Sequence, residues 1–513
     1  MGYLFLTGAT GLLGSYLVRD LVRAGVELAV LVRSTRFETA RQRIEGLVAR
    51  WERQAGHALP RPVVIEGDLT RPGLDLSDEW RGWAAANCHA VLHNAASLTF
   101  HADGPDDEPW RSNLHGTRHV LDFCEAAGIR QFHHVSTAYV CGQRDDLVRE
   151  DELEAGQRHG NDYEVSKFEA EKLVRGAGFL DSLTVYRPAI ILGDSRTGYT
   201  STFHGFYVPL KLVAGLIDKI AGLRPDDETL KTWVKARSQE LWSLLGLKGN
   251  EQKNYVPVDW VSAVMAHVYS HPELHAATYH LTPVRRVPLA MTQRVLEDVF
   301  YRYTEQIDPA SVRTENFDWE SFLQQYFEGM NVYRSYWGDD PRFDSTNTQR
   351  AAPHLPCPEL DEAAIEMMCT FALEANFGWP RPPVQKPEFD VEEHLRDLTG
   401  SPAGNGQPAA VLGLYVSGRG GGQWDLDYDG GRVTAARPGV SRRATATFYL
   451  NSTTFERLAR RQASVPQAIN TGRVVIEGNG VPPDELARAL QFVTCRQKPN
   501  WTEEGAPPGP PDS

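Results

Sequence analysis

The chain has 513 residues, a formal net charge of -14 and an isoelectric point near 5.6. A chain of this length usually forms about two or three domains, each with its own hydrophobic core. The acidic balance argues against nonspecific nucleic-acid binding, because the phosphate backbone is also negative. No apolar run approaches the roughly 20 residues that a membrane helix needs. We therefore expect no nucleic-acid partner, no integral membrane segment and a cytoplasmic location.

Short apolar runs alternate with amphipathic runs in the first part of the chain. The predicted strands are 3–7, 26–32, 63–66, 90–93, 131–136 and 183–192, and the predicted helices are 12–24, 113–127 and 163–175. Strands that alternate with helices predict the α/β class, with a doubly wound parallel Rossmann sheet. A smaller substrate-binding region and a separate α+β domain are expected to follow it.

Changes in composition suggest the domain boundaries. We expect a catalytic domain over 1–387, with the cofactor part at about 1–195 and the substrate part at about 196–387. The substrate part contains a charged insertion at 224–254, which we expect to be helical and whose role the sequence does not reveal. A linker over 388–408, a second domain over 409–498 and a disordered tail over 499–513 complete the expected order.

A glycine signature follows the first predicted strand and opens the first predicted helix. Gly8 permits a tight turn, Gly11 lets the backbone approach a pyrophosphate, and Gly14 lets the helix pack closely on the strand. The pyrophosphate would lie at the helix N-terminus, where free N–H groups favour an anion. Thr10, Leu12 and Leu13, which stand between these glycines, complete the predicted dinucleotide-binding turn.

The end of the second predicted strand bears on the choice of cofactor. NAD sites usually have an acidic residue there, whereas this chain has Arg33, with Arg43 further on. Because a guanidinium suits a 2′-phosphate, NADP is favoured and NAD remains an alternative. Asp68 and Leu69 are expected near the adenine. Asn94, Ala95 and Ala96 are expected on the floor beneath the cofactor.

A tyrosine and a lysine four residues apart form the predicted catalytic centre. On a helix, Tyr163 and Lys167 share a face, so the ammonium should lower the phenol pKa toward the working range. The Thr137 hydroxyl would bind a substrate oxygen beside the phenol, with Ser136 as the alternative. Asn113 would orient Lys167 through a water molecule. The six cysteines contain no C-x-x-C pair and the histidines are scattered, so we expect no metal site.

These motifs resemble a known family. The segments TGATGLLG, HNAA, HVSTAYVCG, DYEVSKFEAEKL and YRPAIILGDSRTG are similar to those of extended short-chain dehydrogenases. More narrowly they resemble the thioester-reductase and fatty acyl-CoA reductase branch, known as the male sterility type. The resemblance implies that NADPH reduces an acyl thioester to an aldehyde, or further to an alcohol, with Thr137 and Tyr163 holding the oxyanion. It also places Pro188 at the cofactor.

The acyl group would then arrive as acyl-CoA or on an acyl carrier protein, because no adenylation or carrier segment precedes the glycine signature. Two other interpretations stay open. One is an epimerase, dehydratase or hydroxysteroid dehydrogenase that acts on a sugar nucleotide or a sterol. The other is a lipid-binding or scaffold protein whose nucleotide site senses redox state. Homodimer formation also stays open.

The C-terminal block has its own pattern. A strand–turn–strand over 416–427, a helix from about 450 capped by Ser452 or Thr453, a strand over 469–479 and a helix over 485–493 are expected. This order and the segment TGRVVIEGN resemble the sterol carrier protein type-two domain. The resemblance implies an apolar tunnel for a lipid or an acyl chain. A dimerisation or stability module is the alternative.

Overall fold

The computed structural model describes residues 2–212, 214, 227–305, 319–379, 389–399, 409–429, 432–441, 443–478 and 481–494. The chain divides into two compact units. The first comprises Met1–Val48 and Val64–Gln385, and the second comprises Ala49–Val63 and Lys386–Ser513.

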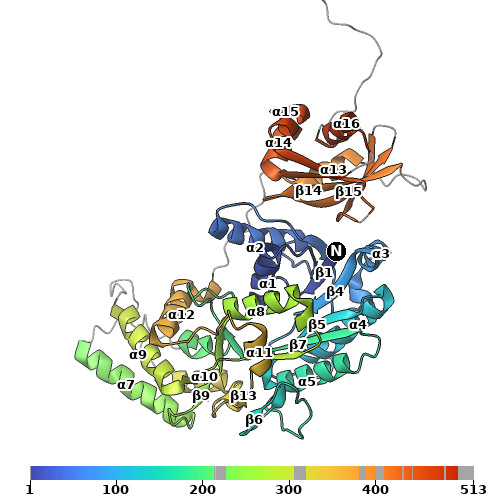
Figure 1. The fold of residues 1–513 in the computed structure, drawn as a ribbon. Coiled ribbons are helices and arrows are strands. Elements are labelled where there is room, and N and C mark those ends of the chain that lie inside the picture. The colour runs from blue at the N-terminus through green and yellow to red at the C-terminus, as the bar shows by residue number, and fades with distance from the viewer. Residues whose placement is uncertain are drawn as a thin grey trace, which may run out of the picture. The chain divides into compact units, whose positions relative to one another are not determined.

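A seven-stranded parallel sheet forms the centre of the first unit (Figure 1). Its strands are β1 (Tyr3–Thr7), β2 (Leu28–Val32), β3 (Val63–Glu66), β4 (Cys88–His93), β5 (Gln131–Val135), β7 (Ser182–Pro188) and β11 (Thr278–Leu281). They lie in the order β11-β7-β5-β4-β1-β2-β3. The chain continues from β1 to one side and from β4 to the other, so a crevice opens between the carboxyl ends of these two strands. This confirms the predicted doubly wound sheet.

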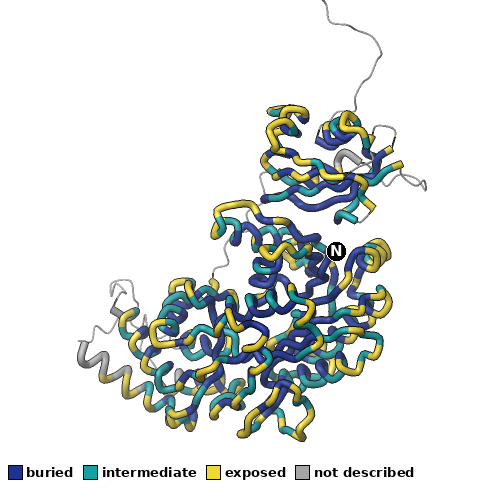
Figure 2. The backbone as a smooth tube through the Cα atoms, in the orientation of Figure 1, coloured by how far each residue is buried: buried dark blue, intermediate teal, exposed yellow. Residues whose placement is uncertain are grey.

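Helices cover both faces of this sheet, which is why its strands are apolar on both sides. Those of the cofactor part and the one that follows it are α1 (Leu12–Arg23), α2 (Ala40–Ala55), α3 (Asp78–Asn87), α4 (Gly116–Ala127), α5 (Asp162–Arg175) and α8 (Val258–Ser270). Helix α1 packs against α8, and α4 packs against α3 and α5. The central strands are almost wholly buried, as the dark blue tube in Figure 2 shows.

The substrate part is mainly helical, and the predicted insertion is largely a helix. Its elements are α7 (Asp227–Leu244), α9 (Leu289–Glu305), α10 (Trp319–Asn331), α11 (Thr346–Ala351) and α12 (Glu362–Glu374), with short strands β6 (Leu147–Val148), β8 (Ile190–Leu192), β9 (Gln252–Lys253), β10 (Tyr255–Pro257), β12 (Val287–Pro288) and β13 (Arg342–Phe343). Helix α7 packs against α9. The predicted strand 183–192 is divided, because β7 stays in the main sheet while β8 pairs with β10.

The C-terminal segment of the second unit, called the C-terminal unit below, combines helices with one sheet. Its elements are α13 (Val391–Thr399), β14 (Ala410–Ser417), β15 (Gly422–Asp429), β16 (Arg432–Pro438), β17 (Ala446–Asn451), α14 (Ser452–Ala459), α15 (Val465–Asn470), β18 (Val474–Gly478) and α16 (Pro483–Thr494). The sheet order is β16-β15-β14-β17-β18. Alternate residues such as Leu412, Leu414 and Val416 face a core that the helices close.

Three expectations for this region need correction. The predicted linker is in part helix α13, whose Val391 and Leu395 lie one turn apart and are buried in the core of the C-terminal unit. Asn451, rather than Ser452 or Thr453, caps α14, because its side chain accepts from Thr454 N at 2.8 Å. The last strand starts only at Val474, since α15 occupies the residues before it.

Residues 400–408 of the expected linker and the tail over 499–513 lie outside the described residues. Within the described part of the chain, none of the helices is both long enough and apolar enough to cross a bilayer.

Candidate active site

A cavity of about 830 Å³ lies at the carboxyl ends of β1, β4, β5 and β7 and extends into the substrate part. In open α/β sheets this edge is where ligands bind. All of the cofactor residues predicted from the sequence lie on its wall. They are Gly8, Thr10, Gly11, Leu12, Leu13, Gly14, Arg33, Arg43, Asp68, Leu69, Asn94, Ala95, Ala96, Tyr163, Lys167 and Pro188. Ser136 and Thr137 also lie on this wall.

The glycine turn after β1 has the shape of an anion cradle. A Cβ atom on Gly14 would lie 1.9 Å from the carbonyl oxygen of Gly8, and one on Gly8 would lie 2.7 Å from the backbone of Ala95. These two glycines are therefore required by packing. A Cβ on Gly11 would meet only the Gly8 oxygen, at 3.5 Å, so its open side faces the cavity. No side chain caps the N-terminus of α1, which leaves its first N–H groups to a ligand.

Two arginines stand at the adenosine end of the cavity. Arg43 donates to the carbonyl oxygen of Arg33 at 2.6 Å and to the Thr10 hydroxyl at 2.8 Å, so it joins β2 to the glycine turn. The Arg33 guanidinium is two-thirds exposed and lies 3.4 Å from the Asp68 carboxylate. Burial raises the pKa of Asp68, but hydrogen bonds from Thr70 and the Arg33 charge lower it overall. Arg33, Arg43 and Asp68 thus place two positive charges and one negative charge where the adenosine ribose would bind.

Thr137 and Tyr163 come together on the cavity wall, as the sequence predicts. Thr137 begins the turn after β5, where its Oγ1 lies 3.4 Å from the carbonyl oxygen of Pro188. Its hydroxyl also lies close enough to Tyr163 to lower the pKa of the phenol. The expected lowering of the phenol pKa is wrong. Burial raises the pKa of Tyr163 to about 12, more than the Thr137 hydrogen bond lowers it. Tyr163 is therefore a neutral proton donor at neutral pH.

Lys167 lies one turn further along α5. Its Nζ donates to the carbonyl oxygen of Val135 at 2.7 Å, at the end of β5. Burial lowers the pKa of Lys167 to about 8, and the Glu171 carboxylate opposes this shift. The ammonium thus keeps its proton at neutral pH but loses it in mild alkali.

Asn113 lies away from the cavity wall and is buried. It accepts from Ser97 N at 2.8 Å and donates to Ser97 O at 3.1 Å and to the Ser166 hydroxyl at 2.9 Å. Ser166 in turn donates to Tyr163 O at 2.8 Å. Asn113 therefore ties the loop after β4 to the catalytic helix, and these bonds do not involve Lys167.

A buried ionic network that was not predicted from the sequence lies close to Lys167 and Ser136. The fully buried Glu171 carboxylate accepts from Arg187 at 2.7 and 3.1 Å and from Arg175 at 2.8 and 2.9 Å. The Ser136 hydroxyl also lies close enough to lower the pKa of Glu171. The sequence offered one signal for this network. Glu171 follows Lys167 by four residues, so the two side chains share a face of the same helix.

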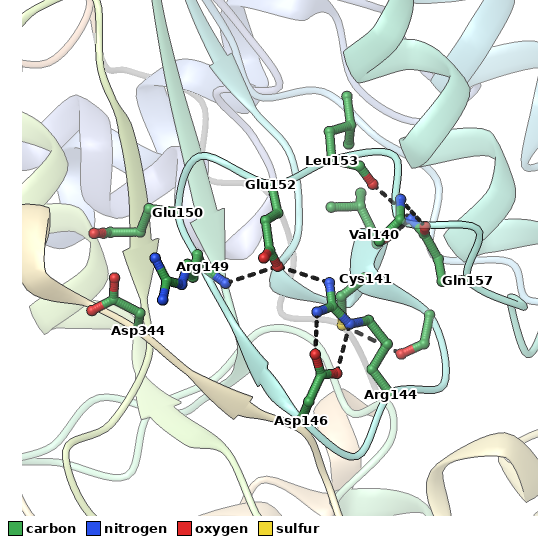
Figure 3. Close-up of polar contacts among 12 residues, drawn as sticks. Val140, Cys141, Arg144, Asp146, Arg149, Glu150, Glu152, Leu153, Gln157 and Asp344 are labelled. Carbon is green, nitrogen blue, oxygen red and sulfur yellow. Dashed lines mark hydrogen bonds and ion pairs between the residues drawn. The ribbon is translucent and has the colours of Figure 1, made fainter.

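The loop between Thr137 and Tyr163 is fixed by charged side chains (Figure 3). Arg144 binds Asp146 at 2.6 and 2.8 Å and Glu152 at 2.8 Å. Gln157 donates to Leu153 O at 2.7 Å. Arg187 donates to the carbonyl oxygen of Glu152 at 2.8 Å, so the loop and the Glu171 network are connected.

A cluster of aromatic rings lies next to Tyr163. Phe100 lies edge-on to Tyr163, with ring centroids 5.8 Å apart, and contacts Tyr333 and Tyr336 at 5.1 and 5.5 Å. Beyond them the wall is largely apolar. It includes Phe206, Leu210, Leu241, Trp242, Leu245, Leu289, Leu296, Phe300, Tyr326, Met330 and Trp337. The insertion helix α7 supplies part of this wall, which answers what the sequence left open.

The parallel sheet, the glycine turn and the cavity define the class of this protein: an NAD(P)-dependent oxidoreductase of the extended short-chain dehydrogenase/reductase type. Residues 6–265 match the family described as Male sterility protein, and the chain belongs to this family. Residues 394–481 match the SCP-2 sterol transfer family, in line with the resemblance of the C-terminal block.

Individual relatives are more distant. The chain is 26% identical to the aldehyde reductase lnaA of Aspergillus flavus over 71% of its length and 35% of that protein. It is 25% identical to the fatty acyl-CoA reductase wat of Drosophila melanogaster over 41% of its length and 47% of that protein. The chain thus spans less than half of these curated relatives. The terminal R domain of the myxalamid PKS-NRPS pathway shares the fold, with a TM-score of 0.57, 24% identity, and 75% and 92% coverage of the two chains.

Proposed function

We propose that this protein reduces an acyl thioester to an aldehyde, or further to an alcohol, with NADPH as the reductant. The observation that carries the proposal is one continuous cavity that holds the dinucleotide cradle, the Thr137–Tyr163 pair and a long apolar compartment. An apolar compartment next to a proton donor suits an acyl chain whose carbonyl carbon is being reduced. The name of the fatty acyl-CoA reductase wat supports the same class of reaction, and that of the aldehyde reductase lnaA supports only the second reduction, from aldehyde to alcohol.

The cavity residues fit a phosphorylated dinucleotide. The open side of Gly11 and the uncapped start of α1 would hold the pyrophosphate. Arg33 and Arg43 would bind the 2′-phosphate of NADP, because guanidinium groups form charge-assisted hydrogen bonds with phosphate oxygens. When bound, this cofactor supplies the hydride that reaches the thioester carbonyl carbon.

In this mechanism, side chains of the cavity wall stabilise the carbonyl oxygen and transfer the protons. As the carbonyl electrons move to oxygen, Thr137 and Tyr163 donate hydrogen bonds to it, and Tyr163 gives up its proton. The Lys167 ammonium stabilises the phenolate that remains, and water returns the proton. The resulting hemithioacetal loses its hydroxyl proton while its C–S bond breaks, so aldehyde and thiol leave. A second hydride and a second proton from Tyr163 would turn the aldehyde into an alcohol.

The thioester would be presented by coenzyme A or by a separate carrier protein. The residues that the proposed mechanism uses all belong to the first unit, so either carrier would have to reach only this unit. The SCP-2 match suggests that the C-terminal unit binds the apolar chain. Titration of residues 389–494 with a fluorescent fatty acid should give saturable binding. A unit that serves only stability or dimerisation would give none.

The test is anaerobic oxidation of NADPH, followed by nicotinamide absorbance, with a chain-length series of acyl-CoAs and the same acyl groups on a carrier protein. Tyr163→Phe serves as the catalytic control. We expect turnover with at least one thioester and a loss of roughly a hundredfold or more in the variant. Failure of every thioester, while alcohols, sterols or sugar nucleotides react, would contradict the proposal.

A further inference from the structure

A polar cluster interrupts the apolar compartment. Ser238 of α7 and Gln293 and Glu297 of α9 all line the cavity. On α9 the lining residues Leu289, Gln293, Leu296 and Phe300 follow helical spacing, so a single face of this helix borders the cavity. The polar pair therefore stands, together with Thr292, beside apolar side chains of the same face, and such isolated polar groups are what fix a ligand in a pocket.

The bonds inside the cluster leave acceptors for a ligand. Gln293 donates from its amide nitrogen to the Ser238 hydroxyl at 3.1 Å and to Glu297 at 2.9 Å. Both N–H groups of the amide are thereby used. Among the hydrogen bonds of the described residues, none involves the Gln293 carbonyl oxygen or the second carboxylate oxygen of Glu297. The cluster thus lines the cavity and keeps oxygen acceptors that the described part of the chain does not use.

An unsubstituted acyl chain would place methylene groups against these oxygens. Displacing their water without a new hydrogen bond costs free energy, and the cost is largest for a carboxylate. We propose that the acyl portion of the substrate carries an O–H or N–H donor that binds Gln293 and Glu297. This inference rests on the proposed thioester reduction and names a narrower substrate class, hydroxy- or amino-substituted acyl groups.

A matched pair elsewhere in the chain provides the control. On α10, Gln324 donates to Glu328 at 2.9 Å with the same four-residue spacing, but both residues are exposed and neither lines the cavity. Such a pair on a surface is an ordinary helix contact worth about 0.2–0.5 kcal/mol. The two pairs therefore differ mainly in whether they face the cavity.

The test measures binding by calorimetry on the full chain saturated with oxidised cofactor, which cannot reduce the ligand. The ligands are straight-chain acyl-pantetheines and their derivatives with a hydroxyl or an amino group at successive carbons. We expect one substituted ligand to bind about tenfold tighter than its parent or better, as one hydrogen bond to a charged group allows. Gln293→Leu should remove most of this preference, and Gln324→Leu should keep it.

Glu297→Gln separates the two donor classes, because it should weaken an ammonium far more than a hydroxyl. Equal affinity for every substituted and parent ligand, or an unchanged preference in Gln293→Leu, would overturn the inference. Turnover of parent and substituted thioesters at equal rates would also overturn it, while leaving the proposed function intact. A donor preference in binding without thioester turnover would instead overturn the proposed function.

Discussion

At the scale of single residues, burial shifts two pKa values at the candidate site in opposite directions. The pKa of Tyr163 rises to about 12 and that of Lys167 falls to about 8, because each charged form is poorly solvated. The phenol is therefore protonated at neutral pH but a weak acid, so the proposed proton transfer needs a charged Lys167 to stabilise the phenolate that forms. The motif predicted which residues meet, but desolvation depends on the whole fold and reverses the expected shift of Tyr163.

We predict that kcat falls as the pH rises through about 8, because Lys167 then loses its proton. Loss of stability does not explain such a fall. The Lys167 pKa in the folded state lies below its ordinary value of 10.5, so between these values the unfolded chain binds more protons and stability rises with pH. The measurement is a pH profile of kcat alongside the melting temperature. Activity that stays constant to pH about 10 would contradict this role of Lys167.

Glu171→Gln should move the alkaline limb of this profile to lower pH, because the Glu171 charge raises the Lys167 pKa. It should also lower the free energy of unfolding by about 3 kcal/mol, since Arg187 loses its buried partner. Glu169→Gln on the same helix is the control, because the Glu169 side chain is 41% exposed and its ion pair with Lys172 is long at 3.9 Å. A profile that moves equally in both variants would assign no special role to Glu171.

Arg33→Ala should raise KM for NADPH by about tenfold and leave KM for NADH nearly unchanged, because one charge-assisted contact to the 2′-phosphate is lost. Arg36→Ala is the matched control, since Arg36 stacks on Phe37 and does not line the cavity. Steady-state kinetics with both cofactors provide the measurement. Equal changes for NADPH and NADH in Arg33→Ala would remove the argument for NADP.

At the scale of elements, the sequence predicts the strands of the sheet better than the helices around it. Buried parallel strands such as Tyr3–Thr7 are short apolar runs that stand out in any context. Helices α2 and α3 went unpredicted, because their charged, partly exposed faces resemble solvated loops. The break after β7 depends on pairing between β8 and β10, whose partners lie far apart in the chain.

The insertion helix α7 provides a prediction at this scale. Leu241 is buried against Tyr326 and Met330 and lines the cavity, so Leu241→Ala should lower stability by about 2–5 kcal/mol and shift the preferred acyl group toward bulkier chains. Leu244 on the same helix is 52% exposed, and Leu244→Ala should change stability by less than about 0.5 kcal/mol. Thermal melts and the chain-length series test both variants. An unchanged preference in Leu241→Ala would mean that acyl chains do not reach α7.

At the scale of the whole molecule, the C-terminal unit has a self-contained core. Its buried cluster is formed by residues from Val391 to Val493, drawn from the helices and strands of that unit. We predict that residues 389–494 unfold cooperatively when expressed alone, because a single contiguous core supports two-state behaviour. A gradual, non-cooperative melt followed by circular dichroism would show that this unit needs the rest of the chain.

The most direct test of thioester reduction is the ratio of thiol released to NADPH oxidised in a single anaerobic reaction with an acyl-CoA or an acylated carrier protein. The mechanism predicts one thiol for each NADPH if the product is an aldehyde, or one thiol for every two NADPH if it is an alcohol. Neither release of thiol nor oxidation of NADPH should occur with the Tyr163→Phe variant. Oxidation of NADPH without release of thiol would show that the carbonyl group reduced at Tyr163 does not belong to a thioester.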